Sequence, residues 1–260
     1  MNVSEALRLL DPREARILLA DATGFSQAAL AGHPEKEIPK DAEGRFLEFA
    51  ERRRKGEPVA YIVGRKEFYG LELAVNPAVL IPRPETELLV DLALERPFSS
   101  ILDLGTGSGA IALALKKHRP GARVTAVEAS AAALVIAKRN AAKHGLEVEF
   151  RHGRWLEAVT GERFHIIVSN PPYVAEGDSH LPGLAFEPAS ALISGVDGLE
   201  DLKRIAAGAP AHLDAGGWLL VEHGQGQDGA VRALLTAAGL GEVRSWPDLA
   251  GIPRVTGGRR

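Results

Sequence analysis

The sequence predicts an α/β fold in which helices cover both faces of a parallel sheet, preceded by a small helical domain and a linking β-hairpin. Two observations lead to this prediction. From residue 99 onward, short apolar segments alternate with helical segments, as they do in parallel sheets. Before residue 65, apolar positions recur three and four residues apart, as they do in helices. A chain of 260 residues is long enough for one large domain with a small companion.

The helical pattern covers the first quarter of the chain. The segments "SEALRLL" and "REARILLADA" have apolar residues at helical spacing, and "DAEGRFLEFAERRRKGEP" does so until Gly56 and Pro58 end it. The next stretch, "EFYGLELAVNPAVLIPRPETE", alternates and is rich in Val, Ile and aromatic residues, which indicates a hairpin. We therefore expect a helical domain over residues 1–65, a β-hairpin linker over 66–82 and an α/β catalytic domain over 83–260.

In the larger domain, strands and helices follow one another along the chain. The predicted strands are "SSILDLG", "RVTAVEAS", "LEVEF", "FHIIVSN" and "GGWLLVEHG". The predicted helices are "GAIALALKKH", "AAALVIAKRNAAKHG", "LEDLKRIAAGAP" and "QDGAVRALLTAAG". Because sheets of this kind bind ligands at the carboxyl ends of their strands, the residues that follow each strand are candidates for a binding site.

The composition excludes several classes of protein. The absence of cysteine rules out disulfides and thiolate metal sites and fits a cytoplasmic location. The N-terminus has no basic region before an apolar block, so it is no signal peptide, and no apolar run reaches membrane-spanning length. The histidines form no metal-binding pattern, so we expect no metal. The net charge of −3 argues against a surface that binds long nucleic acids.

The first strand of the α/β domain leads into a glycine-rich turn. The segment "DLGTGSGAIAL" places Gly105, Thr106, Gly107, Ser108 and Gly109 between this strand and the next helix. Glycine permits a tight turn and lets a ligand approach the backbone at the helix N-terminus. The spacing G-x-G-x-G after an aspartate differs from the dinucleotide fingerprint and is typical of S-adenosylmethionine sites. Glycine turns also occur for packing alone, so this turn is weak evidence by itself.

Two further residues follow strands at the same edge of the predicted sheet. Glu128 ends the second strand at the distance from the glycine turn where an acid binds ribose hydroxyls. Alternatively, its charge only stabilises the helix N-terminus near Ser130; we favour ribose binding. Trp155 follows the third strand and could stack on an adenine ring, or it could belong to the core. The sequence leaves both interpretations of Trp155 open.

The fourth strand ends in the motif Asn170, Pro171, Pro172 and Tyr173. An amide or exocyclic amine is a poor nucleophile because its lone pair is delocalised. The Asn170 side-chain oxygen and the Pro171 carbonyl could accept its two N–H groups and aim the lone pair at a reactive methyl group. The prolines keep this carbonyl in place, and Tyr173 offers a ring face to the planar group. We therefore predict that Asn170, Pro171 and Tyr173 are catalytic and that all four residues bind the substrate.

These motifs together resemble the HemK/PrmC family, which methylates the side-chain amide of a glutamine in class 1 peptide chain release factors. The likeness covers nearly the whole chain and includes "VLIPRPETE", "DLGTGSGAIALAL", "VSNPPYV", "FEPASAL" and "LLVEHGQGQ". The glycine turn and NPPY occur in many methyltransferases. The combination of "IPRPETE", "NPPYV" and a helical N-terminal domain is much more specific to the release-factor enzymes.

The resemblance implies a seven-stranded Rossmann-like methyltransferase fold with an N-terminal domain that binds the substrate. It implies S-adenosylmethionine as cofactor, held by Gly105 to Gly109, Glu128, Trp155 and Asn170. It also implies that residues 170–173 hold the glutamine of a Gly-Gly-Gln tripeptide in a class 1 release factor, whose methylation modulates translation termination. We expect a cytoplasmic monomer without nucleic-acid or membrane partners.

Some positions need separate comment. The family usually has aspartate where Glu128 stands, and the longer side chain should still reach the ribose. An acidic residue usually precedes the tryptophan, whereas this chain has Arg154, so adenine recognition is left in doubt. Arg83 in "IPRPETE" could contact the substrate or pair with Glu85 or Glu87, and we favour the ion pair. Residues 222 and 223, which end the fifth strand, are predicted to support the site or the structure.

Three other functions are compatible with parts of the sequence. A DNA adenine or RNA guanine amino-methyltransferase could use the same NPPY motif, but such enzymes usually need a target-reading domain and basic grooves. A nicotinamide-dependent dehydrogenase is disfavoured by both the glycine spacing and NPPY. A non-catalytic binding module on this fold is disfavoured by the intact NPPY motif.

Overall fold

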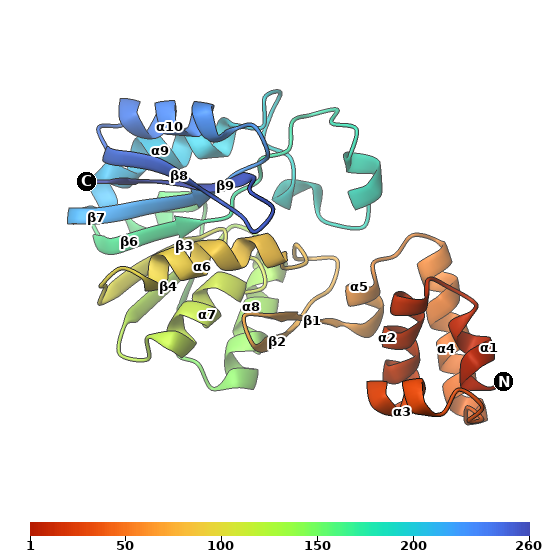
Figure 1. Cartoon of the computed structure of the whole chain (residues 1–260). Helices are drawn as coiled ribbons and strands as arrows, with labels where there is room; N and C mark the ends of the chain where they lie inside the picture. Colours follow the sequence, from red (N-terminus) through yellow and green to blue (C-terminus); the bar gives the residue numbers. More distant parts are fainter. The chain divides into compact units, whose positions relative to one another are not determined.

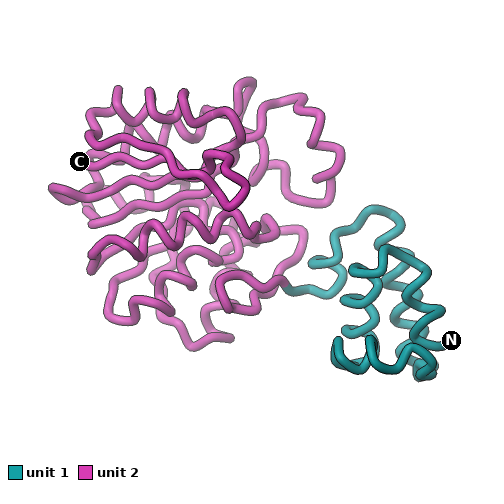
Figure 2. The backbone as a smooth tube through the Cα atoms, in the orientation of Figure 1, with its two compact units in different colours: residues 1–65 teal, residues 66–260 magenta.

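The computed structural model describes all residues from Met1 to Arg260, and the chain forms two compact units, residues 1–65 and 66–260 (Figures 1 and 2). Each unit has its own core of buried apolar side chains. No helix in either unit is both long enough and apolar enough to cross a membrane.

The first unit consists of helices. They are α1 (Val3–Leu7), α2 (Pro12–Thr23), α3 (Gln27–Gly32), α4 (Lys40–Arg54) and α5 (Val59–Val63). The side chain of Asp11 caps α2, and Gly24 ends it with a φ of 73°, a conformation that favours glycine. Leu18 and Phe46, on α2 and α4, are fully buried in the core of this unit. The sequence did not predict α3 and α5, which are short and lie outside the segments with a helical pattern.

The second unit contains a two-stranded hairpin and a seven-stranded sheet. The hairpin is formed by β1 (Arg65–Phe68) and β2 (Leu71–Ala74), and the large sheet has the order β5-β4-β3-β6-β7-β9-β8. Its strands are β3 (Ser100–Leu104), β4 (Arg123–Glu128), β5 (Glu149–His152), β6 (Phe164–Ser169), β7 (Leu213–Glu222), β8 (Gly241–Pro247) and β9 (Pro253–Arg259). The first five strands in this order are parallel, whereas β9 is antiparallel to β7 and β8. The α/β fold with a seven-stranded sheet is thus confirmed.

Helices cover both faces of the large sheet (Figure 1). One face carries α6 (Glu87–Leu94), α7 (Ala110–His118) and α8 (Ala131–His144), and the other carries α9 (Glu200–His212) and α10 (Asp228–Ala237). Neighbouring residues of a strand point to opposite faces. In β3, for example, Ile101 packs with the first group of helices and Leu102 with the second. Both faces of the central strands are therefore buried, which explains their continuous apolar runs.

The segment after the hairpin differs from its sequence-based interpretation. The alternating pattern suggested strand structure up to "RPETE", but β2 ends at Ala74 and irregular chain follows. A 3₁₀ turn over Pro84–Thr86 then leads into α6, which was not predicted. The apolar residues of this stretch, such as Val79 and Ile81, are buried individually without pairing as strands.

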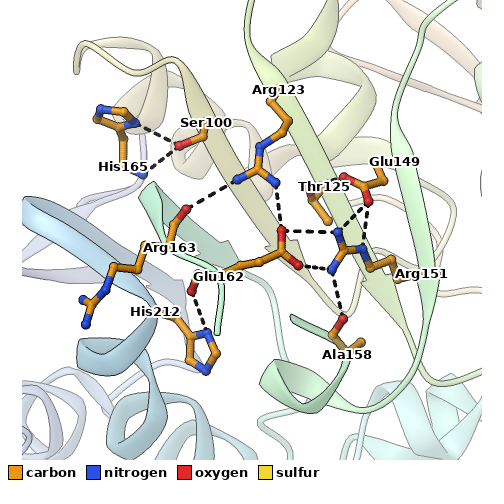
Figure 3. A network of polar contacts seen from close by, with 10 residues as sticks. All are labelled: Ser100, Arg123, Thr125, Glu149, Arg151, Ala158, Glu162, Arg163, His165 and His212. Carbon is orange, nitrogen blue, oxygen red and sulfur yellow. Dashed lines mark hydrogen bonds and ion pairs between the residues drawn. The ribbon is translucent and has the colours of Figure 1, made fainter. Parts of the chain in front are cut away.

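The amino ends of the parallel strands carry a network of ion pairs (Figure 3). Arg123 donates to Glu162 Oε2 at 2.9 Å, and Arg151 pairs with both Glu162 and Glu149. These residues link the amino ends of β4 and β5 to the turn before β6. The network lies at the opposite edge from the carboxyl ends, so it supports the sheet and leaves the predicted ligand edge to other residues.

Candidate active site

A pocket of about 430 Å³ opens where β3, β4 and β6 end. Its wall contains most of the residues that the sequence predicts to bind cofactor or substrate: Gly105, Thr106, Gly107, Ser108, Glu128, Trp155, Asn170 and Pro172. The predicted residues Gly109, Pro171 and Tyr173 lie outside this wall. The motifs meet because β3 pairs with both β4 and β6, which brings their carboxyl ends to one edge.

The glycine turn has the backbone conformation that requires glycine. Gly105, Gly107 and Gly109 have φ angles of 73°, 56° and 86°, in the region that other residues rarely adopt. A Cβ atom on Gly105 would lie 3.1 Å from Cζ3 of Trp155, so this glycine also permits close packing against the indole. A Cβ atom on Gly109 would instead lie 3.2 Å from a methyl group of Leu113. Gly109 therefore supports helix packing behind the pocket.

Buried polar groups hold the glycine turn from beneath. The Thr106 hydroxyl donates to Asp103 Oδ2 at 2.6 Å, and Asp103 Oδ1 has no partner. Burial raises the pKa of Asp103 to about 7, although the hydrogen bond from Thr106 lowers it. Asn140 Nδ2 donates to the carbonyls of Ser108 and Ala74, at 2.9 and 3.1 Å. The turn is thus tied to β3, α8 and the hairpin.

The Glu128 carboxylate binds two backbone N–H groups at the edge of the pocket. Its Oε2 accepts from Gly107 and its Oε1 from Ser130, both at 2.8 Å. The contact with Ser130 matches the interpretation of Glu128 as a charge at a helix N-terminus, and its place in the pocket wall matches the ligand interpretation. Each carboxylate oxygen can accept a second hydrogen bond, so both roles are compatible.

The Trp155 side chain is fixed by an acid from a distant helix. Trp155 has a φ of 50°, which is strained for a bulky residue, and such strain is found mainly at functional sites. Its Nε1 donates to Asp201 Oδ1 at 3.1 Å, and Arg154 Nη2 lies 3.3 Å from the same oxygen. Ser194 donates to Asp201 Oδ2 at 3.0 Å. Asp201 lies in the same pocket wall, and its carboxylate holds the indole in place.

Asn170 and Pro171 present two acceptors without partners at the end of β6. Asn170 Nδ2 donates to Thr86 Oγ1 at 3.1 Å, whereas its Oδ1 makes no hydrogen bond. The Pro171 carbonyl also accepts no hydrogen bond from the chain. Two neighbouring acceptors of this kind suit a group that has two N–H donors, such as a primary amide or an exocyclic amine.

Tyr173 is held by residues from the end of β7 and the loop after it. Its hydroxyl lies 3.4 Å from Glu222 Oε1, and its carbonyl accepts from Gln227 Nε2 at 3.0 Å. Burial raises the pKa of Tyr173 well above its usual value, and the nearby Glu222 charge adds to this. Burial likewise raises the pKa of Glu222 to about 7. Tyr173 therefore stays protonated at neutral pH and is no general base.

The predicted ion pair of Arg83 with Glu85 or Glu87 is wrong. Arg83 pairs instead with Glu187, whose other carboxylate oxygen accepts from the backbone N–H of Ile81 at 3.0 Å. Glu187 belongs to the segment "FEPASAL" and is almost completely buried. A buried carboxylate needs such partners. The pair joins two segments that both contribute residues to the pocket wall.

The chain resembles characterised proteins along almost its full length. Residues 5–64 match the family model of the PrmC N-terminal domain, and residues 84–184 match that of the methyltransferase small domain. The release factor glutamine methyltransferase of Xylella fastidiosa is 50% identical, with 99% of this chain and 96% of that protein aligned. The enzyme of the same name from Pseudomonas aeruginosa is 48% identical, with 95% and 91% aligned.

Solved structures with the same fold are also methyltransferases. A methyltransferase from Pyrococcus furiosus aligns with a TM-score of 0.59 at 20% identity, over 80% of this chain and 96% of that one. The Thermus thermophilus 16S rRNA N2 G1207 methyltransferase, solved with AdoMet and guanosine, has a TM-score of 0.56 at 23% identity, over 75% and 49%. These structures support the fold alone. The near full-length relatives show more: the chain is a methyltransferase that belongs to the release factor glutamine methyltransferase family.

Proposed function

We propose that the chain transfers the methyl group of S-adenosylmethionine to the side-chain amide nitrogen of the glutamine in the Gly-Gly-Gln tripeptide of a class 1 peptide chain release factor. This methylation modulates translation termination. The observation that carries the proposal is the pair of unpartnered acceptors, Asn170 Oδ1 and the Pro171 carbonyl, at the end of β6 beside the pocket. The relatives named for this reaction support the same acceptor.

The pocket fits S-adenosylmethionine in size and in the chemistry of its wall. Its volume of about 430 Å³ lies in the usual range for small-molecule sites. Glu128 offers acceptor capacity for ribose hydroxyls, and the indole of Trp155 offers an aromatic surface for adenine. The glycines allow a ligand to approach the backbone. When bound, the cofactor supplies a methyl group on a positively charged sulfur.

Asn170 and Pro171 orient the weak nucleophile. An amide nitrogen binds two protons, and its lone pair is delocalised into the carbonyl group. When Asn170 Oδ1 and the Pro171 carbonyl each accept one N–H, the nitrogen is fixed with its lone pair directed at the methyl group. The nitrogen gains the methyl group, and one of its protons then passes to water. No strong base is required, in agreement with the protonated state of Tyr173 at neutral pH.

The helical unit, residues 1–65, would bind the body of the release factor. It has its own apolar core and contains as many Lys and Arg as Asp and Glu residues, so it carries no net positive charge that would favour nucleic acid. A second binding surface suits a large folded substrate, because binding energy away from the reacting group can be used to orient that group.

The proposal is tested by offering three acceptors in parallel. Purified enzyme and labelled S-adenosylmethionine are mixed with intact class 1 release factor, with DNA and with ribosomal RNA. We expect label on the release factor alone, with one methyl group located on the glutamine by mass spectrometry. A release factor with Gln→Glu at that position should accept none. Labelling of DNA or RNA with an inert release factor would replace this function by that of a nucleic-acid amino-methyltransferase.

Replacing Glu128 by alanine should weaken S-adenosylmethionine binding by roughly 1.5–3 kcal/mol, the usual value of hydrogen bonds to a charged group. The variant loses the carboxylate that would accept hydrogen bonds from the ribose and that accepts one from the N–H of Gly107. Isothermal titration calorimetry measures the change. Glu157→Ala is the matched control, because Glu157 is exposed and outside the pocket wall. Unchanged affinity in Glu128→Ala would remove Glu128 from the cofactor site.

A further inference from the structure

A chain of polar groups connects Asn170 with Thr86, which also lines the pocket, and with the buried Glu222. Asn170 Nδ2 donates to Thr86 Oγ1 at 3.1 Å, and Thr86, next to α6, is only 4% exposed. Glu222, at the end of β7, is 2% exposed, and Thr86 is one of the groups that lower its pKa. Asn170 and Thr86 are 84 residues apart in the sequence, so only the fold brings these groups together.

The direction of each hydrogen bond in this chain follows from counting protons. The Thr86 hydroxyl has one proton, and its oxygen already accepts from Asn170. A buried hydroxyl proton needs an acceptor. Glu222 is close enough for the Thr86 side chain to lower its pKa, as a hydrogen-bond donor does, although no hydrogen bond of good geometry joins the two side chains. This contact is loose, since Glu222 Oε2 has no partner in good geometry. Loose polar contacts at active sites often tighten when the substrate binds.

We propose that Thr86 and Glu222 are positioning residues that fix the orientation of the Asn170 side-chain amide. A carboxylate can only accept, so it makes the Thr86 hydroxyl donate to it. The Thr86 oxygen can then only accept, and Asn170 must turn its NH₂ group toward Thr86. Asn170 Oδ1 is thereby turned to the acceptor nitrogen. The inference rests on the proposed function, because it requires a substrate that donates N–H.

The reverse orientation of the amide would be unproductive. If the Thr86 hydroxyl donated to Asn170 Oδ1, the NH₂ group of Asn170 would face the NH₂ group of the substrate. Two donors cannot bind one another, so the substrate nitrogen would lose one of the two contacts that fix its lone pair. Tyr173 adds to the arrangement, because its hydroxyl points to the same carboxyl group at 3.4 Å. Glu222 thus acts on both ends of the NPPY motif.

Protonation of Glu222 should allow the Asn170 side-chain amide to adopt the reverse, unproductive orientation. Burial and the charge of Glu85 raise the pKa of Glu222 to about 7, against the lowering effects of Thr86, Arg254 and Tyr173. Above this pH the carboxylate only accepts. Below it, the carboxyl O–H can donate to Thr86, and Thr86 can then donate to Asn170. The amide substrate and the sulfonium cofactor do not titrate in this range, so kcat should fall as the pH drops through about 7. Asp103, beneath the glycine turn, also has a pKa of about 7, so the part of the fall that belongs to Glu222 is the part that Glu222→Gln removes.

The test compares Thr86→Val with Thr86→Ser in steady-state methylation of the release factor. Valine has the shape of threonine without the hydroxyl, whereas serine keeps the hydroxyl. We expect kcat to fall roughly tenfold or more in Thr86→Val, with KM and cofactor affinity within about twofold of wild type, and Thr86→Ser to retain most of the activity. Thr236→Val, an exposed threonine on α10, is the matched control and should behave as wild type.

Two further measurements separate positioning from a merely structural role. In an Asn170→Ala background, Thr86→Val should cause no additional loss, because there is no amide left to orient. Glu222→Gln should be slow, and the decline of its rate near pH 7 should be smaller than in the wild type, because only Asp103 still titrates there. Wild-type kcat in Thr86→Val, an equal loss in both backgrounds or an unchanged pH profile in Glu222→Gln would each overturn the inference. A wild-type enzyme that fails to label the release factor would instead contradict the proposed function.

Discussion

Asn170→Ala should lower kcat for release factor methylation by roughly a hundredfold or more, while the affinity for S-adenosylmethionine stays close to that of the wild type. The side chain supplies one of the two acceptors that fix the amide nitrogen, and misplacing a weak nucleophile is costly. Asn170 is only partly buried, and its side chain makes only one hydrogen bond to the chain, so the variant should fold. Single-turnover methylation with saturating cofactor measures the effect, and calorimetry measures the cofactor affinity.

Asn170→Asp is the informative companion variant. Its carboxylate keeps an acceptor oxygen for the substrate, although it can no longer donate to Thr86. We therefore expect Asn170→Asp to be faster than Asn170→Ala and slower than the wild type. If Asn170→Ala turned over at the wild-type rate, Asn170 Oδ1 would not be needed to orient the amide nitrogen. The Pro171 carbonyl would then have to orient it alone.

The sequence predicted the parts of the site that local patterns encode. The glycine turn, Glu128 and NPPY each follow an apolar strand, and parallel strands bring their carboxyl ends to one edge. That rule alone is sufficient to place Gly107, Glu128 and Asn170 beside one pocket, where all three lie. The helical first unit and the α/β order likewise follow from periodicity over ten or more residues.

Contacts between residues far apart in the sequence could not be predicted in this way. Asp201 reaches Trp155 across 46 residues, and Glu187 reaches Arg83 across 104, so no spacing rule connects them. The motif "IPRPETE" is informative about the family, but nothing in it indicates that Thr86 faces Asn170. The strands β8 and β9 were both missed. The side chains of β8 are mostly exposed and lack the apolar runs of the central strands, and β9 contains Gly257 and Gly258, which disfavour a strand prediction.

The segment after β2 was also interpreted wrongly, because its apolar residues were assigned to the hairpin and helix α6 was not predicted. Val75, Val79 and Ile81 are buried as residues of a strand would be, yet they belong to irregular chain. Their backbone is instead held by side chains, such as Glu187 at the N–H of Ile81. Such side-chain anchoring is typical of loops at binding sites, and a pattern of apolar residues does not reveal it.

Removing residues 1–65 should lower kcat/KM for the intact release factor on the order of a hundredfold, equivalent to about 2.8 kcal/mol of lost binding energy. The remaining unit keeps both cores that enclose the sheet and the whole pocket wall. Cofactor affinity should therefore survive, and calorimetry on the truncated chain checks this together with its folding. Radiolabel transfer at low substrate concentration measures kcat/KM.

A short peptide that carries only the Gly-Gly-Gln loop provides the control for this deletion. Such a peptide has no body for a second surface to bind, so the full-length and truncated chains should methylate it equally slowly. For each substrate, the rate of the full-length chain is divided by that of the truncated chain. The ratio for the intact release factor, divided by the ratio for the peptide, gives the contribution of the helical unit. If the truncated chain methylated the intact factor as fast as the full-length chain, residues 1–65 would not bind the substrate. Specificity for the release factor would then have to arise within residues 66–260, where the segments around Arg83 and Glu187 border the pocket and would be the next candidates.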